Sequence, residues 1–163
     1  MSPPKAPEPT ASLLKKQEWW EKDGVQFECQ GSGKCCVSRG EYGFVYMTGV
    51  DRVAMAKTLK MKTKDFMEKY CEKTDGVWHI RETRTNGDCV FLEGGNRCGV
   101  YEGRPQQCRT WPFWPEVMNA KTWKKEVSSF CPGIGKGRVY SPEEIREIVA
   151  KQAKSEDDLV NGR

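Results

Sequence analysis

Cysteine is the residue type in this sequence that could carry chemistry. Thiolates are soft ligands that hold zinc, iron and iron–sulfur clusters. Eight cysteines among 163 residues are more than core packing needs, and their spacing is too irregular for a repeat. They lie at Cys29, Cys35, Cys36, Cys71, Cys89, Cys98, Cys108 and Cys131. The sequence therefore predicts a thiolate-bound metal centre.

The clearest local signal is Arg104-Pro105-x-x-Cys108-Arg109. Pro105 suits the first position of a short helix, which places Cys108 one turn in, near unpaired N–H groups. The helix dipole and the two arginines would favour the thiolate form of Cys108. The aromatic stretch 111–114 could form a wall that excludes water. The alternative is a tight proline turn with a buried aromatic cluster.

A second thiol-rich segment runs from Cys29 to the adjacent pair Cys35 and Cys36. Gly31 and Gly33 allow its backbone to fold tightly, so that several thiols can turn toward one point. Adjacent cysteines do not readily ligate one ion through both sulfurs. They either divide their roles or serve a centre with several metal ions. The alternative is a glycine turn with incidentally buried cysteines.

Turns should bring further thiols together. Asn86-Gly87 leads into a strand that begins at Cys89, and a second turn leads into a strand that begins at Cys98. The two short strands should form a hairpin with both sulfurs near one site. Cys131 should be delivered by a flexible glycine turn over residues 131–137.

Cys71 and His79 are predicted to stand apart from the metal ligands. Cys71 follows a helix with no cysteine close by, so it is interpreted as a small buried hydrophobic residue rather than a ligand. His79, the only histidine, lies in an alternating strand. It is predicted to face solvent or to be held by hydrogen bonds, with a ligand or proton-relay role as the alternative.

Periodicity and caps predict the other elements. Ser141-Pro142-Glu-Glu144 is a capping box that opens a C-terminal helix over 142–154. The rest comprise an amphipathic helix ending before Gly24, a strand over 43–47, helices from Thr48 and Thr63, and a strand over 77–82. The fold class is therefore α+β, a small single domain whose short strands, hairpin and several helices are arranged around a cysteine-bound metal centre.

Length and composition suit one domain with a modest core. Charged residues make up 31% and hydrophobic residues 37% of the chain, so a metal would supply cohesion that burial alone does not. The expected organisation has a disordered tail over 1–11, a metal-binding domain over 12–155 with its motif region at 25–133, and a frayed tail over 156–163.

Compartment and partners follow from composition. The proline-rich start lacks the apolar segment of a signal peptide, and no apolar run could span a membrane, so we expect a cytoplasmic protein. In a reducing compartment the cysteines favour metal over disulfides, which would be the alternative in an exported protein. The net charge of +4 is mild, which makes nucleic acid an unlikely partner. The partner, a protein or a small molecule, stays unknown.

The chain resembles the YkgJ-type cysteine-cluster family, described as a zinc- or iron-chelating domain. The resemblance spans about residues 25–133 and includes Cys98-x-Val-Tyr101 and Arg104-Pro105-x-x-Cys108-Arg109 with Pro112-Phe113. By position it implies the metal ligands Cys29, Cys35, Cys36, Cys89, Cys98, Cys108 and Cys131. Some members have an additional cysteine where this chain has Ser32. Relatives include flagellin lysine methylases with an iron–sulfur cluster, but this chain shows no additional domain and the methylase activity is not carried over.

Three functions are compatible with this pattern. The favoured one is an iron or iron–sulfur protein, with redox or modification chemistry on an unknown substrate. The second is a structural or interaction module that binds zinc. The third is a cysteine-dependent enzyme, which ranks lowest because His79 would be its sole base. The best four ligands come from Cys29, Cys36, Cys89, Cys98, Cys108 and Cys131, and whether the protein is an enzyme stays open.

Overall fold

The computed structural model describes residues 16–36, 44–83 and 86–163, so the predicted tail over 1–11 lies outside the described residues. Five α-helices are described: α1 (Gly49–Thr58), α2 (Thr63–Tyr70), α3 (Gln106–Thr110), α4 (Ala120–Thr122) and α5 (Pro142–Val160). The strands are β1 (Val25–Phe27), β2 (Cys71–Thr74), β3 (Val77–Ile80), β4 (Leu92–Glu93), β5 (Arg97–Cys98) and β6 (Ile134–Tyr140). Short 3-10 helices are η1 (Lys34–Cys36), η2 (Tyr101–Gly103) and η3 (Pro115–Val117), and the π-helix η4 (Trp123–Ser128) continues α4. The fold is α+β, as the sequence predicts.

The strands of the described residues pair only as antiparallel couples, β1 with β6, β2 with β3, and β4 with β5. One region differs here from what the sequence predicts. The glycine-rich stretch predicted as a flexible turn continues as β6, whose Tyr140 faces Val25 across the pair. Gly135 and Gly137 take positive φ there, φ +79° and +67°, beside the register shift between Gln26 and Phe27. These glycines therefore accommodate a bulge rather than a hinge.

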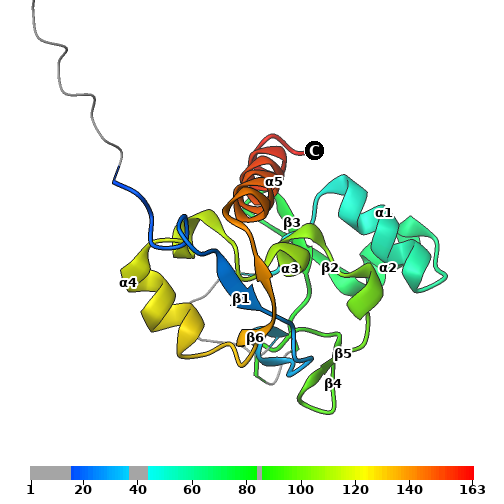
Figure 1. Cartoon of the computed structure of the whole chain (residues 1–163). Helices are drawn as coiled ribbons and strands as arrows, with labels where there is room; N and C mark the ends of the chain where they lie inside the picture. Colours follow the sequence, from blue (N-terminus) through cyan, green and yellow to red (C-terminus); the bar gives the residue numbers. More distant parts are fainter. Residues whose placement is uncertain (1–15, 37–43, 84–85) are drawn as a thin grey trace, which may run out of the picture.

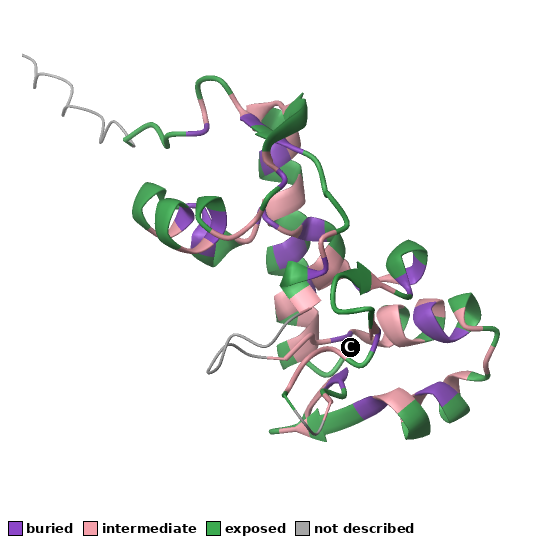
Figure 2. Ribbon diagram, turned by 90° about the horizontal axis from the view of Figure 1, so that it is seen from below, coloured by how far each residue is buried: buried purple, intermediate pink, exposed green. Residues whose placement is uncertain are grey.

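Two hydrophobic cores organise the chain. Helix α4 lies on one side of α3, and helices α1 and α2 lie on the other side (Figure 1). Buried residues are interspersed with exposed ones along the helices (Figure 2), whereas the middle of β6 is exposed. The aromatic core consists of Trp20, Val25, Phe27, Phe113, Val117, Met118, Trp123, Val127 and Ile145. The methionine core consists of Met47, Met55, Ala56, Phe66, Cys71, Ile80, Phe91 and Val100.

The helices of the methionine core begin at the predicted places. Thr48 and Asp51 form a capping box at the start of α1, with each side chain bonded to the other residue's backbone N–H. The second helix begins at Thr63, although its cap is Lys62 and makes no side-chain bond. The strand predicted over 43–47 is reduced, in its described part, to one bridge between Tyr46 and His79.

The N-terminal segment packs as predicted but is not helical where it is described. Residues 19–23 form turns. Trp20 is buried in the aromatic core, and the Trp19 indole N–H donates to the Met118 carbonyl at 2.8 Å. Gly24 then takes a positive φ of +72° against the Tyr140 carbonyl. Contacts of the tryptophans with distant residues outweigh local helix formation here.

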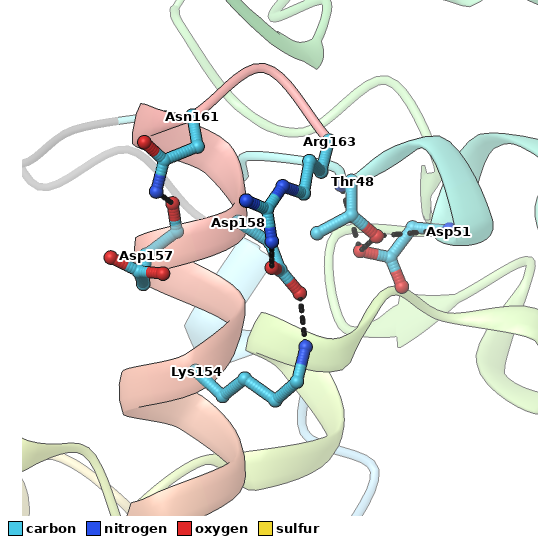
Figure 3. A network of polar contacts seen from close by, with 7 residues as sticks. All are labelled: Thr48, Asp51, Lys154, Asp157, Asp158, Asn161 and Arg163. Carbon is cyan, nitrogen blue, oxygen red and sulfur yellow. Dashed lines mark hydrogen bonds and ion pairs between the residues drawn. The ribbon is translucent and has the colours of Figure 1, made fainter.

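The C-terminal helix opens with the predicted capping box of Ser141 and Glu144. It continues to Val160, past the predicted end at Lys154 and into the stretch expected to fray. Two cations explain the extension, because Asp158 pairs with Lys154 at 2.6 Å and with Arg163 at 3.8 Å. The Arg163 carbonyl accepts from the Gly49 N–H at 3.3 Å, so the end of α5 lies beside the start of α1 (Figure 3).

In the described part of the chain, no helix is both long and apolar enough to cross a membrane.

Candidate metal centre

Three of the other predicted ligands gather around Cys36. The thiols of Cys35, Cys89 and Cys98 lie close enough to the Cys36 thiol to shift its pKa. The backbone supports this arrangement, because the Cys89 N–H donates to the Cys36 carbonyl at 2.8 Å. Cys108 lies in the field of the same group, since Cys35, Cys89 and Cys98 all influence its pKa. We call Cys35, Cys36, Cys89, Cys98 and Cys108 the thiol cluster.

Gly33 sets the position of Cys35 and Cys36. Its φ is +67°, and a Cβ added there would lie 2.5 Å from the carbonyl carbon of Asn96. The loop therefore packs its backbone directly against the turn between β4 and β5, which only glycine permits. The Cys36 N–H closes the loop by donating to the Gly33 carbonyl at 2.9 Å. This contact brings two thiols of the loop to the strand that ends at Cys98.

The predicted hairpin exists but is shorter than expected. β4 and β5 pair Leu92 with Cys98, while Cys89 precedes the pair and bridges to Glu82 instead. Cys89 and Cys98 are both half-buried and pack against the methionine core. The prediction that their sulfurs face one site is consistent with their shared contact to Cys36.

Helix α3 carries Cys108 and is anchored at its start. One carboxylate oxygen of Asp51 accepts the Thr48 N–H at the start of α1, and the other accepts the Gln106 N–H at 3.0 Å. One aspartate therefore holds the first turns of both α1 and α3. Pro105 is the N-cap, with φ −66° and ψ 165°, rather than the predicted first helical residue. Cys108 still lies in the first turn.

Two more side chains fix α3 against its neighbours. The Gln107 amide accepts the Tyr46 N–H at 3.0 Å and donates to the Phe44 carbonyl at 3.2 Å, as a strand neighbour would. The Thr110 hydroxyl donates to the Gln152 side chain of α5 at 2.6 Å. Helix α3 thus joins the two cores at the thiol cluster.

Shared protons give the thiol cluster unequal acidities. Hydrogen bonding to Cys36 lowers the pKa of Cys35 to about 7 and, with the Val100 backbone and Arg104, lowers that of Cys98 to about 6. Hydrogen bonding to Cys36 also lowers the pKa of Cys89. Cys36 is the proton-bearing partner, so its pKa is raised. Near neutral pH the cluster therefore offers thiolates, the form that binds metal.

The sequence predicts that Cys108 is a thiolate ready to bind metal. For the protein without a metal, this prediction is wrong. Burial raises its pKa well above the ordinary value, and the neighbouring cysteines add to the shift, against a smaller opposing effect of Arg104. Arg109 does not face the thiol, since its guanidinium donates to the Arg104 carbonyl at 2.8 Å. Arg104 stacks on the Tyr101 ring at 3.8 Å. Desolvation outweighs the helix dipole at this position.

Cys29 and Cys131 lie outside the thiol cluster in the described residues. Cys29 is exposed, and its sulfur interacts with the Tyr101 hydroxyl, beside the turn that follows Cys98. Cys131 is half-buried against the aromatic core. Their segments are tied together by the Glu28 N–H, which donates to the Gly133 carbonyl at 3.1 Å. Their role as ligands stays a prediction.

Cys71 and His79 belong to the interior. Cys71 is buried in the methionine core, as predicted, and burial raises its pKa to about 11. His79 is 1% exposed, so the solvent-facing alternative is wrong and the hydrogen-bonded one is right. Its ring nitrogens bond Thr74 at 2.8 Å and the Ile80 carbonyl at 2.9 Å, and the ring stacks on Phe44 at 3.8 Å. Both nitrogens are thus engaged in structure.

The chemistry of the thiol cluster fits a soft metal. Sulfur donors, several with lowered pKa, suit zinc and iron–sulfur centres, and all eight cysteines of the chain are free. In the described residues, no three or more cysteine, histidine or acidic side chains stand close enough together to coordinate one ion as they are. The sulfurs would have to draw together around the metal.

A cavity of about 410 Å³ adjoins the thiol cluster. Four of the five thiols line it, those of Cys35, Cys36, Cys89 and Cys108. The wall includes the predicted aromatic residues Trp111 and Trp114, whereas Phe113 lies in the aromatic core instead. Other lining groups are carboxylates from η3, η4 and α5. The thiols therefore face a space that a small molecule could enter.

An α+β fold in which thiols from four chain segments gather beside a cavity defines a cysteine-cluster protein. The chain belongs to the CxxCxxCC family, described as "Putative zinc- or iron-chelating domain", which it matches over residues 28–132. This agrees with the resemblance seen in the sequence and supports metal binding. The matched range contains every cysteine of the chain.

A curated relative is similar over much of the chain. The uncharacterized protein MJ0661 of Methanocaldococcus jannaschii is 27% identical over 124 residues, which cover 72% of this chain and 64% of the relative. The chain thus spans less than two thirds of that relative's length. No solved structure matches the chain.

Several residues that build the site were not predicted. From the sequence, Asp51 is only an acidic residue in the first turn of the helix from Thr48, and its bond to Gln106 joins residues 55 positions apart. Gln107 and Tyr101 carry no signal of their own beyond their place next to the cysteines. Three of the four glutamates of the cavity lie on three later helices and Glu82 lies before Cys89, and no local pattern unites them.

Proposed function

We propose that this protein holds an iron–sulfur cluster, or iron, on the thiolates of Cys35, Cys36, Cys89 and Cys98, with Cys108 beside them. The observation that supports it most is the meeting of three thiols on Cys36 from its own loop and two other segments. Elements this short have few backbone bonds of their own, so a shared ligand is a good physical reason for thiols to converge.

The adjacent pair favours a centre with several metal atoms. Cys35 and Cys36 are neighbours in the chain, and both interact within the cluster. Two adjacent side chains bind two different atoms of a cluster with less distortion than they bind one ion. A four-iron cluster takes four cysteines, which leaves Cys108 as an alternative ligand.

The adjoining cavity favours a reactive centre over a closed structural one. Structural zinc sites are typically sealed by four ligands, whereas reactive centres keep an open side. Here Cys35, Cys36 and Cys89 line a cavity of about 410 Å³. The metal would supply electron transfer or an electrophile; the chain's own aromatic side chains, such as Trp111, would limit water at that side. Redox or modification chemistry on a small substrate is the finer proposal.

Zinc in a structural role is the second candidate. The thiol cluster joins the loop of Cys36, the β4–β5 hairpin and α3, which carry few mutual backbone bonds besides Cys89 to Cys36. A zinc ion there would act mainly as a staple between the two cores.

Metal analysis of anaerobically purified protein tests these alternatives. We expect a broad charge-transfer absorption in the visible range, with iron and acid-labile sulfide in stoichiometric amounts. A colourless protein with one zinc per chain would support the structural zinc site and reject the cluster. A protein without bound metal after purification and anaerobic reconstitution would reject both.

A matched pair of variants locates the centre. Cys98→Ser should abolish the absorption and the bound metal, because it removes a thiol of the cluster. Cys71→Ala removes a buried thiol outside it and should leave the metal content unchanged. Equal loss in both variants would contradict the proposed ligand set.

A further inference from the structure

The cavity beside the thiol cluster has an unusual charge balance. Four of its lining residues are glutamates, Glu82, Glu116, Glu126 and Glu156, and five are aromatic. None of the described lining residues is lysine, arginine or histidine, although the chain has 27 lysines and arginines and a net charge of +4. A cavity lined by one sign of charge focuses that potential on its interior. This cavity would therefore favour a positively charged occupant.

Three of these glutamates stand on well-packed elements. Glu116 of η3 precedes Val117, Glu126 of η4 precedes Val127, and both valines belong to the aromatic core. Glu156 of α5 follows the buried Ser155. The buried neighbours fix the backbone on which each carboxylate stands, so the carboxylate end of the cavity, defined by Glu116, Glu126 and Glu156, is preformed.

A buried amide orients one of the carboxylates. Gln152 is 3% exposed and lines the cavity. Its amide N–H donates to Glu156 at 3.0 Å, while its carbonyl accepts from Thr110. Because both ends of the amide are engaged, Gln152 holds Glu156 in one direction and cannot itself neutralise its charge.

Among the described residues, no lysine or arginine forms an ion pair with three of these glutamates. None of the ion pairs among the described residues involves Glu116, Glu126 or Glu156. Burial, with the nearby charge of Glu156, raises the pKa of Glu116. Like charges held near each other without a counter-ion are destabilising, and a bound cation would relieve that repulsion.

Aromatic rings complete the same region. The rings of Trp111 and Trp114 lie 4.8 Å apart at 75° to each other, so they present two nearly perpendicular walls. The Trp114 indole N–H is held by the Gln107 carbonyl at 3.0 Å, which fixes the ring. Aromatic faces attract organic cations but offer no ligand atoms for a hard metal ion.

We propose that the carboxylate end of the cavity binds a small organic cation, an alkylated or primary ammonium, against Trp111 and Trp114 with Glu116 and Glu156 as counter-ions. The volume of about 410 Å³ suits a small molecule or one extended side chain. The thiols that line the same cavity would then share it with this ligand. The cation site uses none of the proposed metal ligands, so it does not depend on the identity of the metal.

The test uses an isosteric pair of probes on the full chain as purified. Choline and 3,3-dimethylbutan-1-ol have the same shape, but only choline is charged. Calorimetric titration, with tryptophan fluorescence as a second signal, should give choline an affinity about tenfold or more higher than that of the alcohol. Butylammonium in a parallel titration tells whether the site prefers a quaternary or a primary ammonium. Equal affinities for choline and the alcohol would mean a merely apolar cavity and would overturn the proposal.

Two variants on one helix supply the control. Glu156→Gln should weaken choline binding about fivefold or more, whereas Glu147→Gln, exposed on the same helix, should not change it. Both variants should keep the metal content of the parent protein, which separates failure of this site from failure of the metal centre. Unchanged choline affinity in Glu156→Gln, or displacement of choline by millimolar Mg²⁺, would overturn the assignment to an organic cation.

Discussion

Two groups of residues at the cavity, the thiol cluster (called here the thiol end) and the three glutamates of the carboxylate end, are built in different ways. The thiol end rests on η1, β4, β5 and α3, none longer than five residues. The carboxylate end rests in part on α5, a helix of 19 residues with a full capping box, and on elements packed in the aromatic core. Short elements gain little from their own backbone bonds, so the thiol end depends on contacts between side chains.

This difference predicts which end needs its ligand. The carboxylate end should keep its shape with or without a bound cation, because buried neighbours such as Val127 already position it. The thiol end should tighten when metal binds, since its sulfurs do not yet enclose an ion in the described residues. Metal binding and folding should therefore be coupled at one end only.

The largest expected effect comes from Cys36, on which the thiols converge. Cys36→Ser should remove the bound metal and lower the free energy of unfolding by about 3 kcal/mol, roughly a quarter of what a structural metal contributes. In a domain of this size, that corresponds to a fall of about 6–12 °C in melting temperature. Metal analysis and thermal denaturation would measure both.

Cys71→Ala is the control for this prediction. It should cost about 1 kcal/mol through loss of buried volume, with the metal retained. If removing the metal from the parent protein with a chelator leaves its melting temperature unchanged, the thiol end does not depend on its ligand and the comparison fails.

A glycine pair separates backbone strain from steric contact at the thiol end. Gly33→Ala would place a Cβ 2.5 Å from Asn96 at φ +67°, whereas Gly31→Ala, at φ +59°, meets nothing within 4 Å. Gly31→Ala should cost about 1 kcal/mol from the left-handed backbone alone. Gly33→Ala should cost about 2–3 kcal/mol and also lower the metal content, because the loop must move off the hairpin. Denaturant unfolding and metal analysis of the two variants would measure these differences. Equal effects in both variants would mean that the loop does not need the contact between Gly33 and Asn96.

Substitution of Asp51 tests whether the methionine core positions Cys108. Asp51→Asn weakens the bonds to Thr48 and Gln106 and should cost about 1 kcal/mol of stability. It should also lower the metal affinity, because α3 loses its anchor. Asp65→Asn, in the first turn of α2 and exposed, should change neither quantity much. Loss of stability in Asp51→Asn with unaltered metal affinity would show that α3 is held by its other contacts.

The sequence predicted best what is decided locally. The capping boxes at Thr48 and Ser141 need only residues three apart, and both formed. Turn chemistry predicted the hairpin that carries Cys98, although Cys89 lies before its first strand rather than in it. Cys71 was placed correctly because nothing near it in the chain suggested a ligand.

What the sequence missed depends on distant packing. β1 and β6 pair residues more than 100 positions apart, and the glycines of β6 concealed the strand. The acidity of Cys108 was predicted from its helix and its arginines, yet burial by other segments raises its pKa. Glu116 and Glu156 lie 40 positions apart, and only the docking of α5 places both on one cavity.

The smallest expected effect is the pH dependence of cation binding at the carboxylate end. The pKa of Glu116 is raised by burial and by Glu156, and a cation binds only the ionised carboxylate. Protonation therefore competes with the cation, so the choline affinity should fall several-fold as the pH is lowered toward 5, above the ordinary glutamate pKa of about 4.3. Choline has no titrating group, so the change belongs to the protein.

A Glu116→Gln variant assigns that change to one residue. The pKa values of Cys98 and Cys35 are lowered to about 6 and 7, so ionisation of these thiols also changes the field in the cavity. In Glu116→Gln the thiols are intact, so any pH dependence that remains is theirs, and the part that is lost is due to Glu116. Calorimetric titrations of both proteins at pH 7.5 and 5 measure the two parts. If the variant keeps the whole pH dependence, the thiol end controls cation binding, and the two ends of the cavity are one electrostatic site rather than two.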